Sequence, residues 1–536
     1  MRARRIAAAV TALLAAVALT SCGSSGAPEA LRSPAASAAS ARPTPAPVAV
    51  PASSDAYRNY YEIFVGSFYD SNGDGVGDLA GVTEKLSYIR DDLGADGIWL
   101  TPISPSPSYH KYDITDFEGV DPSFGTLADF EALTAAAHRK GIRVLLDLVV
   151  QHTSSQHPWF KKAVAALQAG ESSPYIDYYR FARTPEPGYA QYGSTNIYYS
   201  AAFSPDMPDL NLDDPAVRTE IAGIVKFWLG KGADGFRLDA TTSYYPHDQA
   251  AAAKFIDWLT KTSRAADPDA YVVGEAWTDA STLTSYYASG ADFFNYPFAL
   301  VDGTINADLR AKDGTALAAA TQQWNQTIHA ANPDAMDAPF ISNHDNPRPA
   351  GYLLRKLPAE KLTAATYLLM PGSPFLYYGE EIGMLGAGTD PNKRMPMVWS
   401  ARGGTGTTKA PPGGTYDESA VVPVDHQLTD PNSLLSFYHD VLALKAQYPG
   451  IARGNYTALQ AGDKAVLAFS DAYQGTTIYV LENLDTSSHT EHLAAMGIPS
   501  GAKLADYLLT SGSKKPTLSG HRLTLPAGAI AVIRVH

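Results

Sequence analysis

Four acidic residues each follow a short apolar run, which is typical of a carboxylate near the end of a buried strand. They are Asp147 in RVLLDLVVQH, Asp239 in GFRLDA, Glu275 in VVGEAW and Asp345 in ISNHDN. Several like charges on one rim cost stability unless they serve a function. Chemistry that needs carboxylates, but no cysteine, serine triad or cofactor loop, points to glycoside hydrolysis. In that reaction one carboxylate attacks the anomeric carbon, and a second, held protonated, protonates the leaving oxygen.

One arginine is placed to act on the carboxylate of GFRLDA. Arg237 lies two residues before Asp239, so both side chains project from the same face of a strand. A fixed positive charge there is expected to keep Asp239 ionised and nucleophilic at neutral pH.

The elements that must position these residues are read from the alternation of apolar strands and helices. Strands are expected at 60–68, 95–103 and 142–150, with helices at 82–94 and 126–141 between them. Such alternation indicates parallel βα units, and barrel enzymes build their sites at the carboxyl ends of the strands. The pattern breaks at 150–213, and beyond about residue 450 the segments read as all-β.

We therefore predict an α/β fold with a second, all-β domain. A (β/α)8 TIM barrel is expected at 57–149 and 214–449, with an inserted B domain at 150–213 after the third strand and a C-terminal β-sandwich at 450–536.

The N-terminus predicts export. Residues 1–21 combine a basic start, a short apolar stretch and small residues, as in a secretory signal. The ending LTSC resembles a bacterial lipobox, which predicts lipidation of Cys22, the only cysteine. Plain secretion with an incidental cysteine is the alternative. Residues 22–56 read as a lipidated start and a Pro/Ala/Ser linker. The expected location is the outer face of the bacterial cell membrane, or the medium after release.

The net charge of the chain limits the kinds of partner that it is expected to bind. The chain has 55 acidic and 41 basic side chains, a net charge of −14, and no basic run beyond its start. Nucleic acid is therefore not an expected partner, and membrane contact is expected only through the N-terminal lipid. The oligomeric state is left open.

Five motifs match a known family in order. DLVVQH, MPDLN, GFRLDA, GEAW and SNHD resemble those of the α-amylase family of retaining glycosidases, glycoside hydrolase family 13, from about Tyr57 to the C-terminus. The resemblance implies that Asp239 is the nucleophile, Glu275 the general acid/base, and Asp345 a third acid that grips sugar hydroxyls. It implies substrate contacts for Tyr112, His152, Arg237, His344 and Arg394, with Tyr112 as an aromatic platform and Arg237 orienting the nucleophile.

Smaller features of the resemblance bear on the substrate. Ala240 after the nucleophile goes with α-1,4 activity, and MPDLN resembles the group between oligo-1,6-glucosidases and neopullulanases. We expect hydrolysis of α-1,4-glucosidic bonds in starch or malto-oligosaccharides through a covalent glycosyl-enzyme. The alternatives are an α-glucosidase, a cyclomaltodextrinase, a 4-α-glucanotransferase or, in another class, a non-catalytic glucan-binding lipoprotein.

One loop predicts a metal. DSNGDGVGDL begins like an EF-hand, but its twelfth position is Gly81 rather than glutamate, and a strand precedes it. The family resemblance instead implies a structural Ca²⁺ loop. Its expected ligands are Asp70, Asn72, Asp74, the Val76 carbonyl and Asp78. The family's shared calcium site uses an asparagine where this chain has Gln151, and often a histidine where it has Ser243, so we expect that site to be lost.

Overall fold

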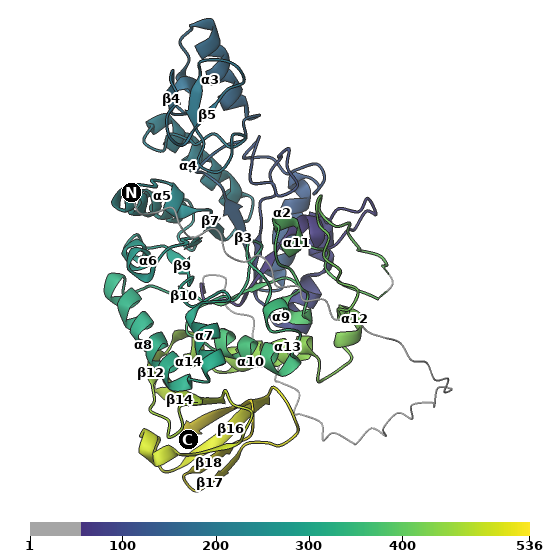
Figure 1. Cartoon of the computed structure of the whole chain (residues 1–536), viewed down its shortest axis with the longest axis vertical. Coiled ribbons are helices and arrows are strands. Elements are labelled where there is room, and N and C mark those ends of the chain that lie inside the picture. Colours follow the sequence, from purple (N-terminus) through teal and green to yellow (C-terminus); the bar gives the residue numbers. More distant parts are fainter. Residues whose placement is uncertain (1–54, 402, 536) are drawn as a thin grey trace, which may run out of the picture. The chain divides into compact units, whose positions relative to one another are not determined.

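The structure is a computed structural model that describes residues 55–401 and 403–535 (Figure 1). The predicted signal peptide, Cys22 and almost all of the linker lie outside these residues. Within them, no helix is long and apolar enough to cross a membrane.

Eight parallel strands form the barrel that the alternating pattern predicts, and this prediction is confirmed. Their order is β10-β9-β8-β7-β3-β2-β1-β11. Backbone bonds from Ser373 to Asp337 and from Phe375 to Pro339, both 2.9 Å, join the ends of that order. The strands are β1 (Tyr60–Ile63), β2 (Gly97–Leu100), β3 (Arg143–Leu148), β7 (Gly235–Leu238), β8 (Tyr271–Gly274), β9 (Asp292–Phe294), β10 (Asp337–Ala338) and β11 (Phe375–Tyr377).

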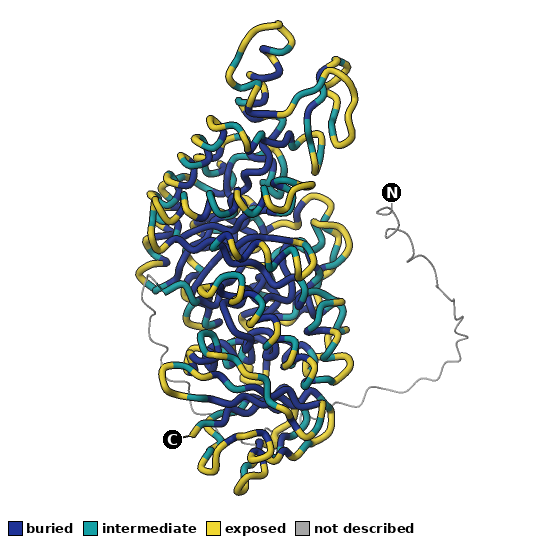
Figure 2. Tube along the Cα trace, turned by 90° about the vertical axis from the view of Figure 1, so that its left-hand side faces the viewer, coloured by how far each residue is buried: buried dark blue, intermediate teal, exposed yellow. Residues whose placement is uncertain are grey.

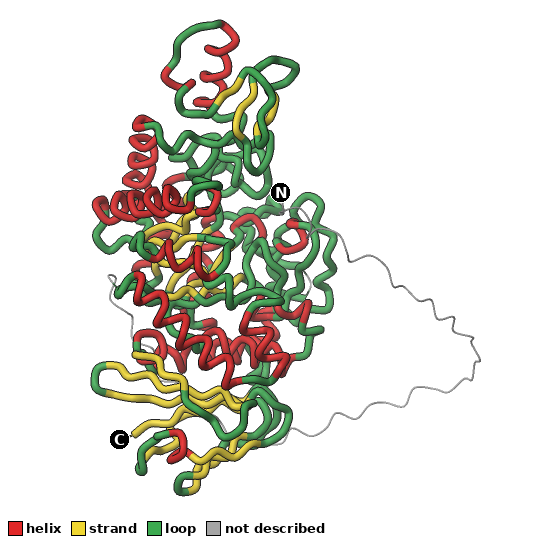
Figure 3. The backbone as a smooth tube through the Cα atoms, turned by 60° about the vertical axis from the view of Figure 1, so that its left-hand side comes forward, coloured by secondary structure: helices red, strands yellow, loops and turns green. Residues whose placement is uncertain are grey.

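Helices flank these strands (Figure 3) and bury their apolar faces on them. Sequence signals set their starts: Thr126 and Asp129 form a capping box at α2, and Asp214 caps α4 ahead of Pro215. The longer helices are α1 (Leu79–Glu84), α2 (Leu127–Arg139), α4 (Pro215–Gly230), α5 (Gln249–Ala266), α6 (Ala280–Tyr287), α7 (Thr304–Ala311), α8 (Gly314–Ala331), α10 (Leu357–Leu368) and α13 (Leu434–Gln447). Single turns are α9 (Pro349–Tyr352), α11 (Asp390–Lys393), α12 (Val424–Gln427) and α14 (Gly450–Arg453).

The three strands predicted before the insertion are shorter than expected, and one predicted helix is divided. The first strand ends at Ile63, and a 3-10 turn over Val65–Ser67 leads into the loop. The helix predicted at 82–94 is divided into α1 and a π-helical turn, Tyr88–Leu93. That turn directs the Tyr88 hydroxyl to Glu381 at 2.6 Å, a tertiary contact that the local pattern does not contain.

A subdomain is inserted between β3 and β7, as predicted. It contains α3 (Pro158–Ala169), a 3-10 turn (Pro174–Ile176) and a small sheet in the order β4-β6-β5: Phe181–Ala182, Tyr198–Ser200 and Tyr189–Gln191. An isolated bridge between His152 and Asp209 ties the segment back to the barrel rim.

Antiparallel sheets form the C-terminal part, which confirms the predicted all-β domain. A five-stranded sheet has the order β12-β13-β14-β19-β16, and a three-stranded sheet the order β15-β18-β17. Buried residues run through the barrel and these sheets (Figure 2). The strands are β12 (Asn455–Ala458), β13 (Val466–Tyr473), β14 (Thr476–Asn483), β15 (His489–His492), β16 (Ala502–Leu509), β17 (Thr517–Ser519), β18 (Arg522–Leu525) and β19 (Ala529–Val535).

Candidate active site

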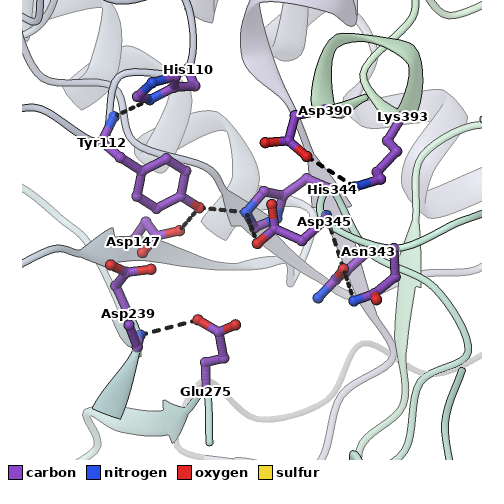
Figure 4. A network of polar contacts seen from close by, with 12 residues as sticks. His110, Tyr112, Asp147, Asp239, Glu275, Asn343, His344, Asp345, Asp390 and Lys393 are labelled. Atoms are coloured by element: carbon purple, nitrogen blue, oxygen red, sulfur yellow. Dashed lines mark hydrogen bonds and ion pairs between the residues drawn. The ribbon is translucent and has the colours of Figure 1, made fainter. Parts of the chain in front are cut away.

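The four acids of the sequence motifs gather at the carboxyl ends of the barrel strands (Figure 4). Asp147 is the fifth residue of β3, Asp239 follows β7, and Glu275 follows β8. Asp345 lies in the loop after β10. Parallel strands place their carboxyl ends on one rim, so residues separated by about 200 positions in sequence meet there.

Arg237 is shared by three of these carboxylates. It is fully buried, and its Nη1 donates to Asp147 at 2.7 Å and to Asp239 at 2.8 Å, while Nη2 donates to Glu275 at 2.6 Å. One guanidinium thus holds Asp239 and Glu275 within reach of a single glycosidic bond. The expected pairing with Asp239 is present, but it is one of three.

Burial raises the pKa of the Asp239 carboxyl, and contact with Arg237 opposes that rise. Arg237 favours the ionised form of Asp239, while burial and the neighbouring Asp345 favour the neutral form, so the ionised state of Asp239 at neutral pH stays a prediction.

Glu275 has the surroundings of a general acid. Burial raises its pKa, again against Arg237. Its Oε1 accepts from the Tyr296 hydroxyl at 3.1 Å, and its Oε2 accepts from the backbone N–H of Ala240 at 3.0 Å. These bonds fix the carboxyl in place, so that it can face a leaving group without further ordering.

Asp345 is held by two cations. Arg394 donates through Nη2 to Oδ1 at 2.7 Å, and His344 Nε2 lies 3.2 Å from Oδ2. Burial alone would raise the pKa of Asp345, but His344 and Arg394 hold it well below its usual range. Asp345 is therefore an ionised carboxylate at neutral pH.

Tyr112 connects the two sides of the rim. Its hydroxyl donates to Asp147 at 2.9 Å and lies 2.7 Å from His344 Nε2, and its ring stacks on His344 with centroids 5.5 Å apart. The side chain also lines the cleft, where the resemblance expects an aromatic platform.

His152 lies on the side of the inserted subdomain. Its Nδ1 is 2.8 Å from Gln151 Oε1, and its Nε2 is 3.1 Å from the Tyr112 carbonyl. Gln151 in turn donates to Asp209 at 2.8 Å. Burial lowers the pKa of His152 to about 4, so this histidine is neutral at pH 7.

A cleft of ≈ 340 Å³ joins these groups, and two exposed aromatic residues at it were missed by sequence reasoning. Trp277 is 55% exposed and stacks on Tyr296 at 5.3 Å; Phe203 is 50% exposed and meets His152 edge-on at 5.4 Å. Trp277 had a signal, its place two residues after Glu275, whereas Phe203 lies in the irregular insertion and had none. The lining residues are His110, Tyr112, His152, Phe203, Ser204, Met207, Asp239, Ala240, Glu275, Trp277, Asp345, Asp390 and Arg394.

The sequence patterns also did not identify Glu62 as a residue of the site. This acid in YYEIF lies on β1, and its carboxylate accepts from His344 Nδ1 at 2.6 Å. An acid inside an otherwise apolar strand was the available signal.

The loop at residues 70–78 is tied by its own backbone. Asp70 accepts from the N–H groups of Gly73 at 2.6 Å and Gly75 at 2.7 Å. Asp78 caps α1 through Gly81 at 2.7 Å and also accepts from Ser71 at 2.8 Å. Across the described residues, no three Asp, Glu, His or Cys side chains converge as metal ligands.

Lys409 covers this loop from outside. Its backbone N–H donates to the Gly75 carbonyl at 2.8 Å, and its ammonium donates to the Asp74 carbonyl at 2.9 Å. Gly75 has φ +94°, and a Cβ there would come within 2.5 Å of the lysine side chain. The calcium expected at this loop stays a prediction.

At the position of the family's shared calcium site, Gln151 bonds Asp209 and His152 directly. Ser243 lies in a 3-10 turn, Thr241–Ser243. The amide therefore joins the carboxylate and the histidine without a metal between them, and the loss of that site stays a prediction as well.

Comparisons with known proteins agree with this geometry. The model of the α-amylase catalytic domain matches residues 62–454. "Alpha-amylase 3" of Dictyoglomus thermophilum is 37% identical over 451 residues, which are 81% of this chain and 86% of that protein. Eubacterium rectale Amy13B is 38% identical with a TM-score of 0.86, covering 90% of this chain and 96% of that one. The α-amylase from H. orenii is 32% identical with a TM-score of 0.78, covering 90% and 100%. This chain belongs to the α-amylase family and is a glycoside hydrolase.

Proposed function

We propose that this enzyme hydrolyses α-1,4-glucosidic bonds in starch or malto-oligosaccharides with retention of configuration. The observation that carries the proposal is Arg237, whose one guanidinium bonds both Asp239 and Glu275 beside an ionised Asp345. A nucleophile and an acid held against one arginine suit attack and protonation at a single bond.

The residues divide the reaction into two displacements. Asp239 attacks the anomeric carbon while Glu275 gives its proton to the leaving glycosidic oxygen, which forms a glycosyl-enzyme ester. Glu275, now ionised, then takes a proton from water, and that water attacks the anomeric carbon and frees Asp239. Asp345, Arg394 and the histidines bind sugar hydroxyls during both steps.

Azide rescue separates the two carboxylate roles. Asp239→Ala and Glu275→Ala each lower kcat on starch by a factor of about 10⁴ or more. On an activated α-glucosyl donor, azide restores turnover to both variants. It yields a β-glycosyl azide from Asp239→Ala, by one inversion, and an α-glycosyl azide from Glu275→Ala, by two. The same anomer from both variants would contradict the assignment.

Product profiles decide the substrate. We expect starch and maltotriose to be cleaved to shorter α-1,4 products and isomaltose to be left intact. Relatives of this chain carry other names, among them a trehalose synthase/amylase at 32% identity and an oligo-1,6-glucosidase at 27%. Release of terminal glucose alone would favour the α-glucosidase alternative, chain redistribution the 4-α-glucanotransferase, and preferred ring opening of cyclodextrin the cyclomaltodextrinase.

We propose a structural Ca²⁺ at residues 70–78. Asp70, Asn72 and Asp74 offer side-chain oxygens and Val76 its carbonyl, which suits a hard cation. Asp70 and Asp78 each already accept three hydrogen bonds, whereas Asn72 and Asp74 accept one each, so the latter two have more free valence for an ion. No catalytic step is assigned to the ion.

We also propose export and lipid anchoring at Cys22. The support is the sequence alone: the basic and apolar leader and the LTSC ending. Growth with an alkyne fatty acid should label the wild-type protein and leave Cys22→Ser unlabelled. Label on Cys22→Ser, or none on either protein, would contradict the anchor.

A further inference from the structure

Glu62 places a buried carboxylate behind the active site. On β1, Tyr60 and Glu62 alternate with Tyr61 and Ile63, and the Glu62 side chain is 2% exposed. Its Oε1 accepts two bonds from His344, at 2.6 Å from Nδ1 and at 3.2 Å from the backbone N–H. Glu62 does not line the cleft, so it can affect the substrate only through His344.

The contacts of the His344 ring define its charge. Nδ1 faces the Glu62 carboxylate and therefore carries a hydrogen. Nε2 faces Asp345 Oδ2 at 3.2 Å and the Tyr112 oxygen at 2.7 Å. The Tyr112 hydroxyl gives its own hydrogen to Asp147, so its oxygen accepts from the ring. Every partner of the ring accepts, and two of the partners, Glu62 and Asp345, are carboxylates, so a hydrogen on both nitrogens, and hence an imidazolium, satisfies all of them.

The surrounding charges support the same state. Asp147 of β3 and Asp239 after β7 add negative charge near the ring, while Arg237 of β7 and Arg394 after α11 oppose it. Burial would lower the pKa of His344, but Asp345 and Glu62 raise it to about 10. Burial raises the pKa of Glu62 itself, and its contact with His344 opposes that rise.

We propose that Glu62 is a positioning residue that holds His344 as an imidazolium and, through it, keeps Asp345 ionised and aimed into the cleft. A neutral His344 would have one hydrogen for three acceptors, and either Glu62 at Nδ1, or Asp345 and Tyr112 at Nε2, would lose the bond. A buried charge left without a partner is costly, so the ring and both carboxylates work as one unit. For its kinetic part this proposal rests on the proposed glycosidase function.

The variant Glu62→Gln tests this role of Glu62, and Glu381→Gln is the matched control. Glu381 is also fully buried beside the barrel and accepts from the hydroxyls of Tyr61 and Tyr88, both at 2.6 Å, but it does not touch the cleft. Nitrogen-15 spectra of labelled histidine follow the His344 ring from pH 5 to pH 10, and its signal is assigned by its absence from His344→Gln.

In the wild type and in Glu381→Gln we expect His344 to remain an imidazolium through pH 8. In Glu62→Gln its titration should move down by one pH unit or more, and kcat on maltodextrin should fall by about 10- to 100-fold, as when a histidine loses an orienting carboxylate. Glu62→Asp keeps the negative charge on a shorter side chain, so it should partly restore both the titration of His344 and kcat.

A His344 that is neutral at pH 8 in the wild type would overturn the proposal, as would an unchanged titration in Glu62→Gln. A fall in kcat without a shift of the titration would also overturn it, since that is what a merely structural residue would give. If Glu62→Gln does not fold, Glu62→Asp and the wild-type titration decide the same question. The spectra need no substrate, so failure of the glycosidase proposal would be seen separately, as absent turnover in the wild type.

Discussion

Two buried histidines beside the same cleft differ in charge. His344 lies between Glu62 and Asp345, and burial is outweighed there by two carboxylates. His152 lies between the Gln151 amide and a backbone carbonyl, and burial lowers its pKa to about 4. Both side chains are almost completely buried, so burial does not distinguish them.

The difference teaches that the charge at this rim depends on the partners of each residue. The His344 side joins full charges from β1, from Arg394 after α11 and from the loop after β10. On the His152 side, the two ring nitrogens face neutral groups, and the carboxylate of Asp209 is joined to the ring through Gln151. A sugar in the cleft would meet an anion on one side and a neutral imidazole on the other.

The largest expected effect is a loss of folding free energy on substitution of His344. His344→Gln leaves Glu62 and Asp345 without their shared cation, and we expect the free energy of unfolding to fall by about 3–5 kcal/mol. His152→Gln removes bonds between neutral groups and should cost about 1–3 kcal/mol. Urea unfolding at pH 7 measures both, and equal losses would contradict the assignment of one charged and one neutral side.

The pH dependence of stability should separate the two sides by sign. The folded-state pKa of His344, about 10, lies above the unfolded value near 6.5, so its contribution is complete below about pH 6.5 and is lost as the pH rises through 10. The pKa of His152 is lowered to about 4, so its contribution is present above about pH 6.5 and is lost as the pH falls through 4.

Melting curves from pH 4 to pH 10 test whether the two histidines stabilise the fold in opposite pH ranges. His344→Gln should flatten the alkaline loss of melting temperature by a few °C, and His152→Gln the acid loss. If both variants reduce the loss of melting temperature at the same end of the pH range, the assignment of a charged His344 and a neutral His152 is wrong.

A smaller effect is expected at Gln151. Gln151→Asn shortens the arm that joins Asp209 to His152 by one methylene, so one of the two bonds is lost, at a cost of about 1 kcal/mol. We expect KM for maltodextrin to rise by about 3- to 10-fold with kcat nearly unchanged. The exposed Gln156→Asn is the control, and a variant indistinguishable from it would show that the bridge does not position His152.

The smallest effect extends the comparison to the loop at residues 70–78, whose carboxylates face backbone N–H groups rather than cations. A chelator should lower the melting temperature by a few °C, as loss of a bound ion requires. Asp74→Ala should abolish this response, while Asp302→Ala, at a fully exposed acid, should keep it. A wild-type protein that ignores the chelator would remove the proposed Ca²⁺.

Local patterns were enough to predict the architecture and the motif residues. Short apolar runs that alternate with helical segments, and helix caps such as Thr126, depend on neighbours in sequence, so the barrel, the insertion and the all-β domain could all be predicted and are confirmed. The motif acids stand next to their strands, and the structure brings Asp239, Glu275 and Asp345 to one cleft as expected.

Only the tertiary structure decided how these residues are charged and held. Glu62 and His344 are 282 residues apart, and Arg237 reaches Asp147 and Glu275 in addition to the nearby Asp239; no local pattern encodes these distant contacts. Phe203 comes from an irregular loop without periodicity. By itself, the sequence determined which side chains stand at the ends of the strands. Closure of the barrel determined their partners, because a pKa depends on burial and on charges within a few ångströms in space, whatever the separation along the chain.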